Sequence, residues 1–256
     1  MRTTMAPSPA SVTRDPAGVL LKGVCFSYPA QRRRMAPVAA IDALSLTIEP
    51  GEFVAFVGPS GCGKTTLLEL VCGLLAATGG QLESDDAVLM PQRDQLLPWL
   101  DALGNAALAQ RIQGAGREQA RASARPLMQQ LGLGGFEHAR PYELSGGMRQ
   151  RVAFLRTLLS GKPVLCLDEP FGALDALTRA EMRDWLVTAL VAQPRTTLLV
   201  THDVEEACVL ADRVVVLSPR PARVRAVLAV DAPRPRRATD PVVVALRERA
   251  LEALAA

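Results

Sequence analysis

Short, wholly apolar runs recur along the chain, and the segments between them carry apolar residues at helical spacing. Residues 53–57, 87–90 and 164–167 contain no charged side chain, which is typical of strands that a parallel sheet buries on both faces. Residues 148–160 place apolar side chains three and four positions apart, which predicts a helix. The alternation of the two patterns predicts an α/β fold in which helices cover both faces of a parallel sheet.

The same patterns predict the remaining elements. Gly79 and Gly80 are expected to break the chain between a helix and a strand, because glycine weakens both kinds of element. Residues 241–254 are expected to form an amphipathic helix that packs on its own domain, with Val244, Leu251 and Leu254 roughly in register on one face. Further strands are predicted at 19–27, 44–48, 197–200 and 213–217, and further helices at 66–72, 178–191 and 204–210.

Composition divides the chain into regions. Residues 1–17 are rich in Pro, Ser, Thr and Ala without periodicity, and are expected to be disordered. Between residues 93 and 142, Ala, Leu, Gln and Arg dominate, which favours helices over strands. We therefore expect a helical subdomain at about residues 93–158, inserted in a main domain at 18–220. Residues 221–256 form a C-terminal extension whose arginines are interrupted by prolines. These arginines are expected to lie on a solvated surface, the alternative being contact with anionic lipid.

The overall composition excludes several classes of protein. With 256 residues, of which 49% are hydrophobic and 21% charged, the chain can bury a core like an ordinary globular protein. A net charge of +3 is too small for the concentrated basic face that a nucleic-acid partner needs. The five cysteines include no C-x-x-C pair, so neither a disulfide framework nor a zinc site is indicated. No stretch has the ~18 apolar residues of a membrane span or the pattern of a signal peptide, so we expect a soluble, cytosolic chain.

Residues 58–65 read Gly-Pro-Ser-Gly-Cys-Gly-Lys-Thr and join a buried strand to a helix. This is the order and spacing of the phosphate-binding loop G-x-x-x-x-G-K-[ST], whose N–H groups and helix dipole surround a phosphate group. Lys64 is then expected to reach the β- and γ-phosphates, and the Thr65 hydroxyl to ligate Mg²⁺. A glycine-rich turn that only caps a helix would explain Gly61 and Gly63 but not the Lys64–Thr65 pair.

Two carboxylates follow the apolar run at 164–167. Open α/β sheets bind ligands where parallel strands end, and Asp168 and Glu169 stand at such an end. Asp168 is expected to hold Mg²⁺ beside Thr65, directly or through water. Glu169 is expected to face a water molecule that attacks the γ-phosphate. A solvated acidic turn would fit any Asp–Glu pair, but it would not predict the buried run before it or the phosphate loop upstream.

Residues 144–151, Leu-Ser-Gly-Gly-Met-Arg-Gln-Arg, resemble the signature sequence of ATP-binding cassette (ABC) proteins. The resemblance extends from about residue 19 to residue 217, with the expected motifs in order. It implies a P-loop ATPase core with N-terminal antiparallel strands and an inserted helical subdomain. It also implies that the loop at Leu174–Asp175 couples two ATP sites.

The resemblance assigns roles to single residues. It implies that an aromatic ring stacks on adenine at Tyr28, and that Gln92 senses both Mg²⁺ and the γ-phosphate. The catalytic residues that it implies are Glu169, His202 and Lys64. The Mg²⁺ ligands that it implies are Thr65, Gln92 and Asp168. The residues expected to contact ATP are Tyr28, Gly58, Pro59, Ser60, Gly61, Cys62, Gly63, Lys64, Thr65, Thr66, Gln92, Ser145, Gly146, Gly147 and Asp168.

In the ABC family two cassettes pair head to tail, and the signature of one caps the γ-phosphate bound by the other. Ser145, Gly146 and Gly147 would then offer a hydroxyl, N–H groups and a helix dipole to the partner's nucleotide. The resemblance therefore implies a homodimer that ATP holds together and that hydrolysis releases. By itself, Ser-Gly-Gly would instead be an ordinary turn with Ser145 as the N-cap of a helix.

Two further stretches indicate a branch of the family. Residues 169–175, Glu-Pro-Phe-Gly-Ala-Leu-Asp, resemble bacterial importers. Residues 91–100 are similar to the nitrate, sulfonate and taurine importer group, which includes importers of pyrimidine thiamine precursors. This implies a cytoplasmic ATPase, peripheral on the inner face of the cell membrane, with permease partners and, indirectly, an extracytoplasmic solute-binding protein. The alternative is a soluble ABC-type ATPase switch that is not coupled to transport.

The apolar group Leu96, Leu97, Trp99 and Leu100 has two interpretations. It either forms a groove for a cytoplasmic helix of the permease or packs within the helical subdomain. Nearby, Gly104–Asn105 departs from the importer group, which usually carries an acidic residue before Asn. The contacts that the resemblance implies at that position are therefore not carried over.

Overall fold

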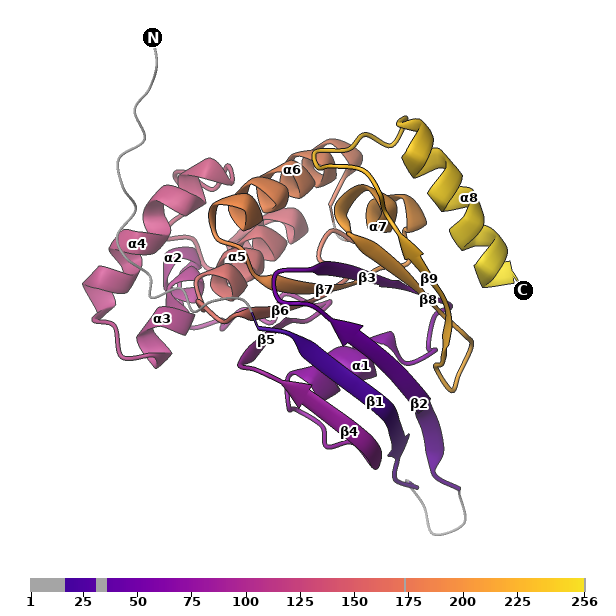
Figure 1. Cartoon of the computed structure of the whole chain (residues 1–256). Helices are drawn as coiled ribbons and strands as arrows, with labels where there is room; N and C mark the ends of the chain where they lie inside the picture. The colour runs from indigo at the N-terminus through magenta and orange to yellow at the C-terminus, as the bar shows by residue number, and fades with distance from the viewer. Residues whose placement is uncertain (1–16, 31–35, 173, 256) are drawn as a thin grey trace.

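The computed structural model describes residues 17–30, 36–172 and 174–255. Within these residues the strands form a three-stranded and a six-stranded sheet, and α1 (Lys64–Val71) packs between them (Figure 1). The stretch expected to be disordered, residues 1–17, lies outside the described residues except for its last position.

The six-stranded sheet forms the centre of the fold. Its order is β5 (Ala87–Met90), β6 (Val164–Asp168), β7 (Thr196–Val200), β3 (Phe53–Val57), β8 (Arg213–Leu217) and β9 (Val224–Ala229). The strands from β5 to β8 in this order are parallel, as predicted, whereas β9 pairs antiparallel with β8 at the edge. The stretch after residue 220 therefore adds a strand to the central sheet.

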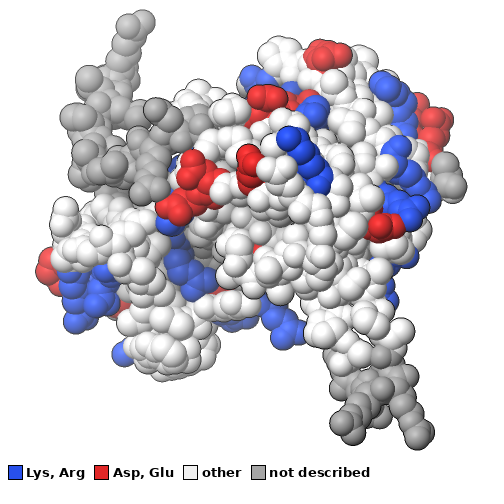
Figure 2. Space-filling model, turned by 60° about the horizontal axis from the view of Figure 1, so that its bottom comes forward, with Lys and Arg blue, Asp and Glu red and all other residues white. Residues whose placement is uncertain are grey.

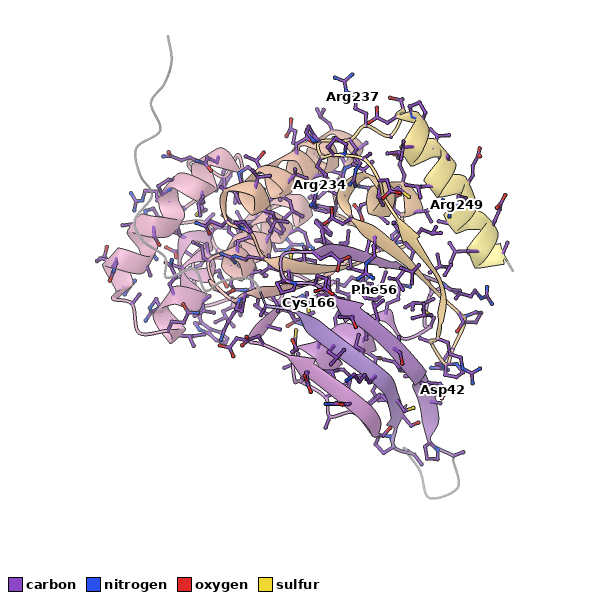
Figure 3. The ribbon with its side chains drawn as sticks, in the orientation of Figure 1. Asp42, Phe56, Cys166, Arg234, Arg237 and Arg249 are labelled. Carbon is purple, nitrogen blue, oxygen red and sulfur yellow. The ribbon has the colours of Figure 1, made fainter. Side chains whose placement is uncertain are left out.

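Apolar side chains on both faces hold this sheet. All residues of β3 are buried, and because successive side chains point to opposite faces, they divide between two apolar clusters. Phe53 and Val57 belong to the cluster under the outer helices, whereas Val54 and Phe56 belong to the cluster around α1. Figure 3 places Phe56 and Cys166 in the middle of the molecule.

The smaller sheet is antiparallel, with β1 (Val19–Tyr28) between β2 (Val38–Ile48) and β4 (Gly79–Ser84). The strand predicted at 44–48 is the end of the longer β2. The prediction that Gly79 and Gly80 break the chain is wrong, because they begin β4. A Cβ at Gly80 would lie 2.2 Å from the Gly23 carbonyl oxygen, so glycine is required for the close approach of β4 to β1.

The segment between β5 and β6 is helical, as its composition predicts. Asn105 fixes its first turn: the buried side chain accepts from Leu97 N at 2.7 Å and donates to Leu97 O at 3.1 Å. This asparagine therefore has a structural role. The helices gather at one side of the molecule (Figure 1) and are α2 (Ala102–Ala106), α3 (Leu108–Ile112), α4 (Arg117–Gln130), the 3₁₀ turn η1 (Pro141–Glu143) and α5 (Gly146–Leu158).

The chain after β6 adds α6 (Ala176–Ala192), α7 (Val204–Leu210) and α8 (Pro241–Ala255). The last helix packs on its own domain as predicted, and Leu254 of the predicted stripe packs against the core, but the prediction is wrong for the other two residues. Val243, Leu246 and Ala250 are buried, whereas Val244 and Leu251 are 41% and 46% exposed. The reason is that α8 turns the Val243 face toward α7, β8 and β9. None of the described helices is both long and apolar enough to span a bilayer.

The arginines after residue 220 do not all lie on a solvated surface, contrary to the prediction. Arg236 is 7% exposed and donates to the carbonyl oxygens of Ala211 at 2.6 Å and Ala232 at 2.8 Å. Arg234 Nη2 donates to Asp212 Oδ2 at 3.0 Å. Figure 3 shows Arg237, by contrast, at the edge of the molecule. Since Ala211 directly follows α7, Arg236 caps the C-terminal end of that helix.

Arg236→Met should lower the free energy of unfolding by about 2–4 kcal/mol, because it leaves buried carbonyl groups without their charged donor. Urea denaturation followed by circular dichroism measures this change. Arg237→Met, at the neighbouring exposed position, is the matched control and should change the free energy by less than about 0.5 kcal/mol. Equal stability of the two variants would contradict the capping role of Arg236.

Candidate functional site

The phosphate loop, residues 58–65, joins β3 to α1 at the carboxyl edge of the central sheet. Gly63 has a φ of 124°, and a Cβ there would lie 2.6 Å from the Ala40 carbonyl oxygen, so a side chain would displace β2. Lys64 is 7% exposed, and its Nζ donates to the carbonyl oxygens of Gly58 at 2.8 Å and Pro59 at 3.0 Å. The loop therefore holds the ammonium group of Lys64 among its own carbonyl groups.

The side chain of Cys62 belongs to the apolar cluster around α1 and is 1% exposed. Burial raises the pKa of its thiol, although the charge of Lys64 acts in the opposite direction. A buried, protonated thiol is a poor nucleophile and is not readily modified. Any contact of Cys62 with a nucleotide is therefore left to its main chain.

Thr65 and Asp168 meet as predicted. Thr65 Oγ1 donates to Asp168 Oδ2 at 2.8 Å. Asp168 is 4% exposed, and burial raises the pKa of its carboxyl group despite the Thr65 hydrogen bond, which lowers it. A cation beside this carboxylate would offset the cost of burying its charge. The hydroxyl and carboxylate oxygens are ligands that Mg²⁺ prefers, so the pair fits the expected metal.

Asp168 would supply one carboxylate to a Mg²⁺ ion bound at this position. The described part of the chain contains no group of three or more His, Cys, Asp or Glu residues that could hold a metal ion. Mg²⁺ commonly keeps several water ligands and binds through one or two carboxylates together with substrate phosphates. The site is therefore suited to a metal that arrives with a nucleotide.

Glu169 contacts two other predicted site residues. Its φ of 47° is left-handed, which is uncommon for a residue with a Cβ and turns the chain out of β6. Gln92 Nε2 donates to Glu169 Oε2 at 2.9 Å, and His202 Nδ1 lies 3.2 Å from Glu169 Oε1. Each carboxylate oxygen thus has its own partner. Gln92 and His202 hold the side chain that is expected to act on water.

The topology of the sheet explains this convergence. The loops after β3, β5, β6 and β7 carry Lys64, Gln92, Glu169 and His202, respectively. The carboxyl ends of parallel strands meet at one edge, where open α/β sheets bind their ligands. The catalytic and Mg²⁺-binding residues predicted from the sequence are therefore together at this edge.

Tyr28 lies at the end of β1, in the smaller sheet. Its hydroxyl is 2.9 Å from Thr66 Oγ1 in α1, and its ring makes an edge contact with Phe26 at a centroid distance of 4.9 Å. The side chain is partly exposed, at 38% for the residue. The predicted adenine contact is therefore next to the phosphate loop helix, with an aromatic surface open to solvent.

Ser145, Gly146 and Gly147 begin α5, as the signature pattern predicts. Ser145 Oγ accepts from Met148 N at 3.2 Å and is the N-cap. Within the described chain, no hydrogen bond or ion pair joins these three residues to the phosphate loop. A helix start with small residues can bind an anion. The contact predicted for these residues is with the γ-phosphate bound by a second copy of the chain, and it stays a prediction.

The ordering of the His202 loop is a feature that the sequence analysis did not identify. Asp203 caps α7 by accepting from Glu206 N at 3.1 Å, and its own N–H donates to Thr201 Oγ1 at 3.0 Å. Glu206 is 3% exposed, and burial raises the pKa of its carboxyl group. An Asp followed three residues later by Glu just before an apolar helix is a signal of a helix start, and it could have located this cap.

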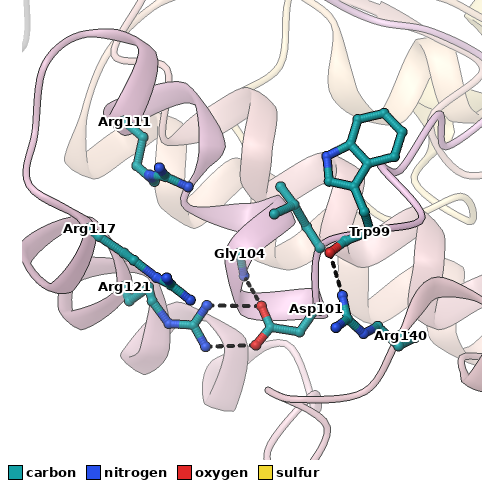
Figure 4. Close-up of a pocket in the computed structure, with 8 residues that line it drawn as sticks. Trp99, Asp101, Gly104, Arg111, Arg117, Arg121 and Arg140 are labelled. Carbon is teal, nitrogen blue, oxygen red and sulfur yellow. Dashed lines mark hydrogen bonds and ion pairs between the residues drawn. The ribbon is translucent and has the colours of Figure 1, made fainter.

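A second candidate surface lies in the helical subdomain. A cavity of about 170 Å³ is lined by Arg111, Arg117, Arg121 and Arg140 together with Trp99, Leu100, Asp101 and Gly104 (Figure 4). Figure 2 shows charged side chains of both signs interspersed on one face of the molecule. The lining of this cavity contains four arginines. This arginine cup has one carboxylate, that of Asp101.

Asp101 is already occupied by partners inside the chain. Arg121 donates to its two oxygens at 2.9 and 2.7 Å, Gly104 N donates at 2.7 Å, and His138 Nδ1 lies 3.3 Å away. Burial acts to raise the pKa of Asp101, but these hydrogen bonds and the Arg121 charge together lower it to about 2. The other arginines of the cup therefore have no local carboxylate left to neutralise them within this cavity.

The members of the apolar group next to the cup differ in how far they are exposed to solvent. Leu96 is 8% exposed and packs in the core, whereas Trp99 is 67% exposed. The Trp99 carbonyl group accepts a hydrogen bond from Arg140. Subdomain packing therefore explains Leu96, whereas the exposed indole of Trp99 leaves both interpretations open for that residue.

Asp101→Asn should remove an acid-sensitive part of the stability. The pKa of about 2 in the folded protein lies below the ordinary value of 3.8 for an aspartate carboxyl group, so the contribution is complete above about pH 4 and is lost as pH falls toward 2. After allowance for solvent screening we expect about 1 kcal/mol at neutral pH. Urea denaturation between pH 2.5 and 7 measures the difference between wild type and variant. A difference that does not shrink toward pH 2.5 would contradict this assignment.

The model of the ABC transporter family matches residues 41–172 of this chain. The chain is 46% identical over 228 residues to the aliphatic sulfonates import ATP-binding protein of Rhodococcus jostii, covering 86% of this chain and 89% of that protein. It is 41% identical over 210 residues to the taurine import ATP-binding protein of Burkholderia pseudomallei, covering 78% and 81%.

Solved structures with the same fold include a dimeric bacterial ABC transporter cassette. It superposes with a TM-score of 0.76 at 28% identity, over 84% of this chain and 99% of that one. A cassette dimer in a post-hydrolysis state bound to ADP and Pi gives a TM-score of 0.75 at 27% identity, over 84% and 99%. The phosphate loop and the carboxylates after β6 therefore lie in a fold known to hold a hydrolysed nucleotide.

Proposed function

Because this chain belongs to the ABC transporter family, we propose that it is the ATP-hydrolysing subunit of an importer. The observation that carries the proposal is the contact of Gln92 and His202 with Glu169, beside the Thr65–Asp168 pair. The relatives named for sulfonate and taurine import support coupling to transport. No observation favours the alternative of an ATPase switch without transport.

The proposed reaction converts ATP and water to ADP and phosphate. The water oxygen attacks the γ-phosphorus, the bond from that phosphorus to the ADP oxygen breaks, and Glu169 accepts the proton of the water. Lys64 and His202 hold the γ-phosphate oxygens, on which charge is spread in the transition state. Mg²⁺, held by Thr65 and Asp168 with Gln92 nearby, would supply neutralisation of the phosphate charge.

The active form is proposed to be a head-to-tail homodimer. The loop, the carboxylates and Tyr28 surround a nucleotide from one side, and the start of α5 is not bonded to them within one chain. In the dimer, Ser145, Gly146 and Gly147 of one copy would contact the γ-phosphate held by the other. The dimeric state of the similar cassette structures supports this arrangement.

The solute is proposed to be a small anion of the sulfonate, taurine or nitrate type. The two relatives described above are named for sulfonate and taurine, and both are more than 40% identical to this chain. A pyrimidine thiamine precursor is the other solute class indicated by residues 91–100. Uptake of these solutes by a strain that lacks the gene decides between the two classes.

The permease is proposed to contact Trp99 and the arginine cup from outside. The exposed indole offers apolar area, and the cup offers positive charge without a free carboxylate. This contact would place the chain at the inner face of the cell membrane. A solute-binding protein on the outer side would act through the permease.

Glu169→Gln should retain ATP binding and lower the rate of hydrolysis at least about 100-fold, because glutamine cannot accept the proton of the attacking water. A phosphate-release assay measures the rate, and size-exclusion chromatography with Mg²⁺-ATP measures dimer formation. We expect this variant to accumulate as an ATP-bound dimer. Normal turnover would remove Glu169 from the catalytic role, and a persistent monomer would contradict the proposed dimer.

Trp99→Ala should weaken co-purification with the permease about tenfold, because it removes an exposed aromatic anchor. Leu74→Ala is the matched control, since Leu74 is similarly exposed, at 63% against 67%, and lies outside the cup. Hydrolysis by the purified subunit alone should not change in either variant. Recovery of the permease in equal amounts with both variants would place the contact elsewhere.

A further inference from the structure

Arg179, early in α6, contacts two loops at the same time. Its Nη2 donates to the Leu174 carbonyl oxygen at 3.1 Å, and its Nη1 forms an ion pair with Asp203 Oδ2 at 3.7 Å. Leu174 directly precedes Asp175, the N-cap of α6, and Asp203 directly follows His202. The guanidinium group is planar and rigid, so it fixes the distance between its two partners.

The two loops belong to opposite halves of the proposed site. A Cβ on Gly147 would lie 3.2 Å from Leu174 Cδ2, so the signature start packs directly on Leu174. On the other side, His202 contacts Glu169 at 3.2 Å. Arg179 therefore lies between two parts of the proposed site. One is the surface that would contact the nucleotide bound by the partner copy, and the other is Glu169, which would act on the nucleotide bound by the same chain.

Helix stability does not explain this arginine. A positive charge near the N-terminal end of a helix opposes the helix dipole. The Arg179 Nε is buried and has no hydrogen-bond partner, which costs free energy. The contacts made by the other two nitrogens offset these costs, together with the attraction between Arg179 and the buried carboxyl group of Glu206, whose pKa burial raises and the arginine acts to lower.

We propose that Arg179 is a positioning residue that couples the Leu174–Asp175 loop to the His202 loop. When the partner copy contacts the signature and the Leu174–Asp175 loop, Arg179 transmits the position of Leu174 to Asp203 and so to His202. The inference rests on the proposed function, since it concerns the rate at which Glu169 and His202 act. The proposed role of Arg179 does not involve a contact with ATP.

Arg179→Met removes both contacts and keeps the aliphatic part of the side chain. We expect kcat to fall about tenfold and KM for ATP to stay within about twofold, because the reacting groups lose alignment whereas the binding groups remain. Arg179→Lys should give an intermediate kcat, because one ammonium group cannot replace the fork at both partners. Steady-state phosphate release by the full-length chain with Mg²⁺-ATP measures both constants.

Arg183→Met is the matched control. Arg183 lies one turn further along α6, is partly buried, and has no side-chain hydrogen bond or ion pair to Leu174 or Asp203. Its charge acts on Glu206, as that of Arg179 does, so the control also accounts for the loss of that attraction. This control should keep kcat within about twofold of wild type. Thermal unfolding of all variants separates positioning from stability, since a purely structural role would lower the unfolding midpoint and ATP binding together.

Asp203→Asn tests the route, because asparagine still caps α7 but carries no charge. If Arg179 acts through Asp203, the double variant should lose no more rate than Arg179→Met alone. Independent losses that multiply would overturn the coupling. If the wild type hydrolyses ATP and Arg179→Met has the same kcat, this inference alone is overturned. If the wild type does not hydrolyse ATP, the proposed function is overturned and this inference with it.

Discussion

The parallel pairing of β6, β7 and β3 is the constraint on which the site depends. Val200 at the end of β7 is in register with both Phe56 in β3 and Asp168 in β6. The pairing continues past the strands, because Glu169 N donates to Val200 O at 2.8 Å and Thr201 N to Phe56 O at 3.2 Å. A slip of one residue would turn every buried side chain to the opposite face. The apolar clusters on both faces therefore fix the register of the strands, and with it the positions of Asp168, Glu169 and His202 at the carboxyl edge of the sheet.

Those parts of the fold that depend on local pattern could be predicted from the sequence. Phe53–Val57 and residues 164–167 are apolar throughout, and the loop at 58–65 has a fixed spacing, so these strands and the position of the loop between strand and helix can be predicted. The parallel sheet followed from the alternation of elements. Each of these features is encoded within about ten neighbouring residues.

The parts that the sequence did not reveal depend on partners distant in the chain. Gly79 and Gly80 look like breakers, and only their approach to Gly23 in β1 makes them a strand start. Arg236 looks solvated, and only the carbonyl groups beyond α7 and β9 make it a buried cap. The left-handed Glu169 is set by its bond to β7. Contacts at long sequence separation decide these cases, and periodicity carries no information about them.

The helix α5 contacts two of the loops that leave the central sheet. Arg149 in α5 pairs with Asp94 at 3.0 Å, close to Gln92, and Gln150 Nε2 in α5 donates to Pro170 O at 3.2 Å. One helix therefore contacts both the loop after β5 and the loop after β6. Any displacement of α5 would be felt at Gln92 and at Glu169 together.

The smaller sheet has a consequence for how this chain can vary. The Ala40 carbonyl of β2 lies so near Gly63 that the tip of the nucleotide loop and the N-terminal sheet share one steric boundary. A cassette assembled by joining this loop to the antiparallel sheet of a distant relative would have to reproduce that boundary to within a few tenths of an ångström. Adding a side chain at Gly63 and shifting β2 at Ala40 would therefore disturb the same boundary from its two sides.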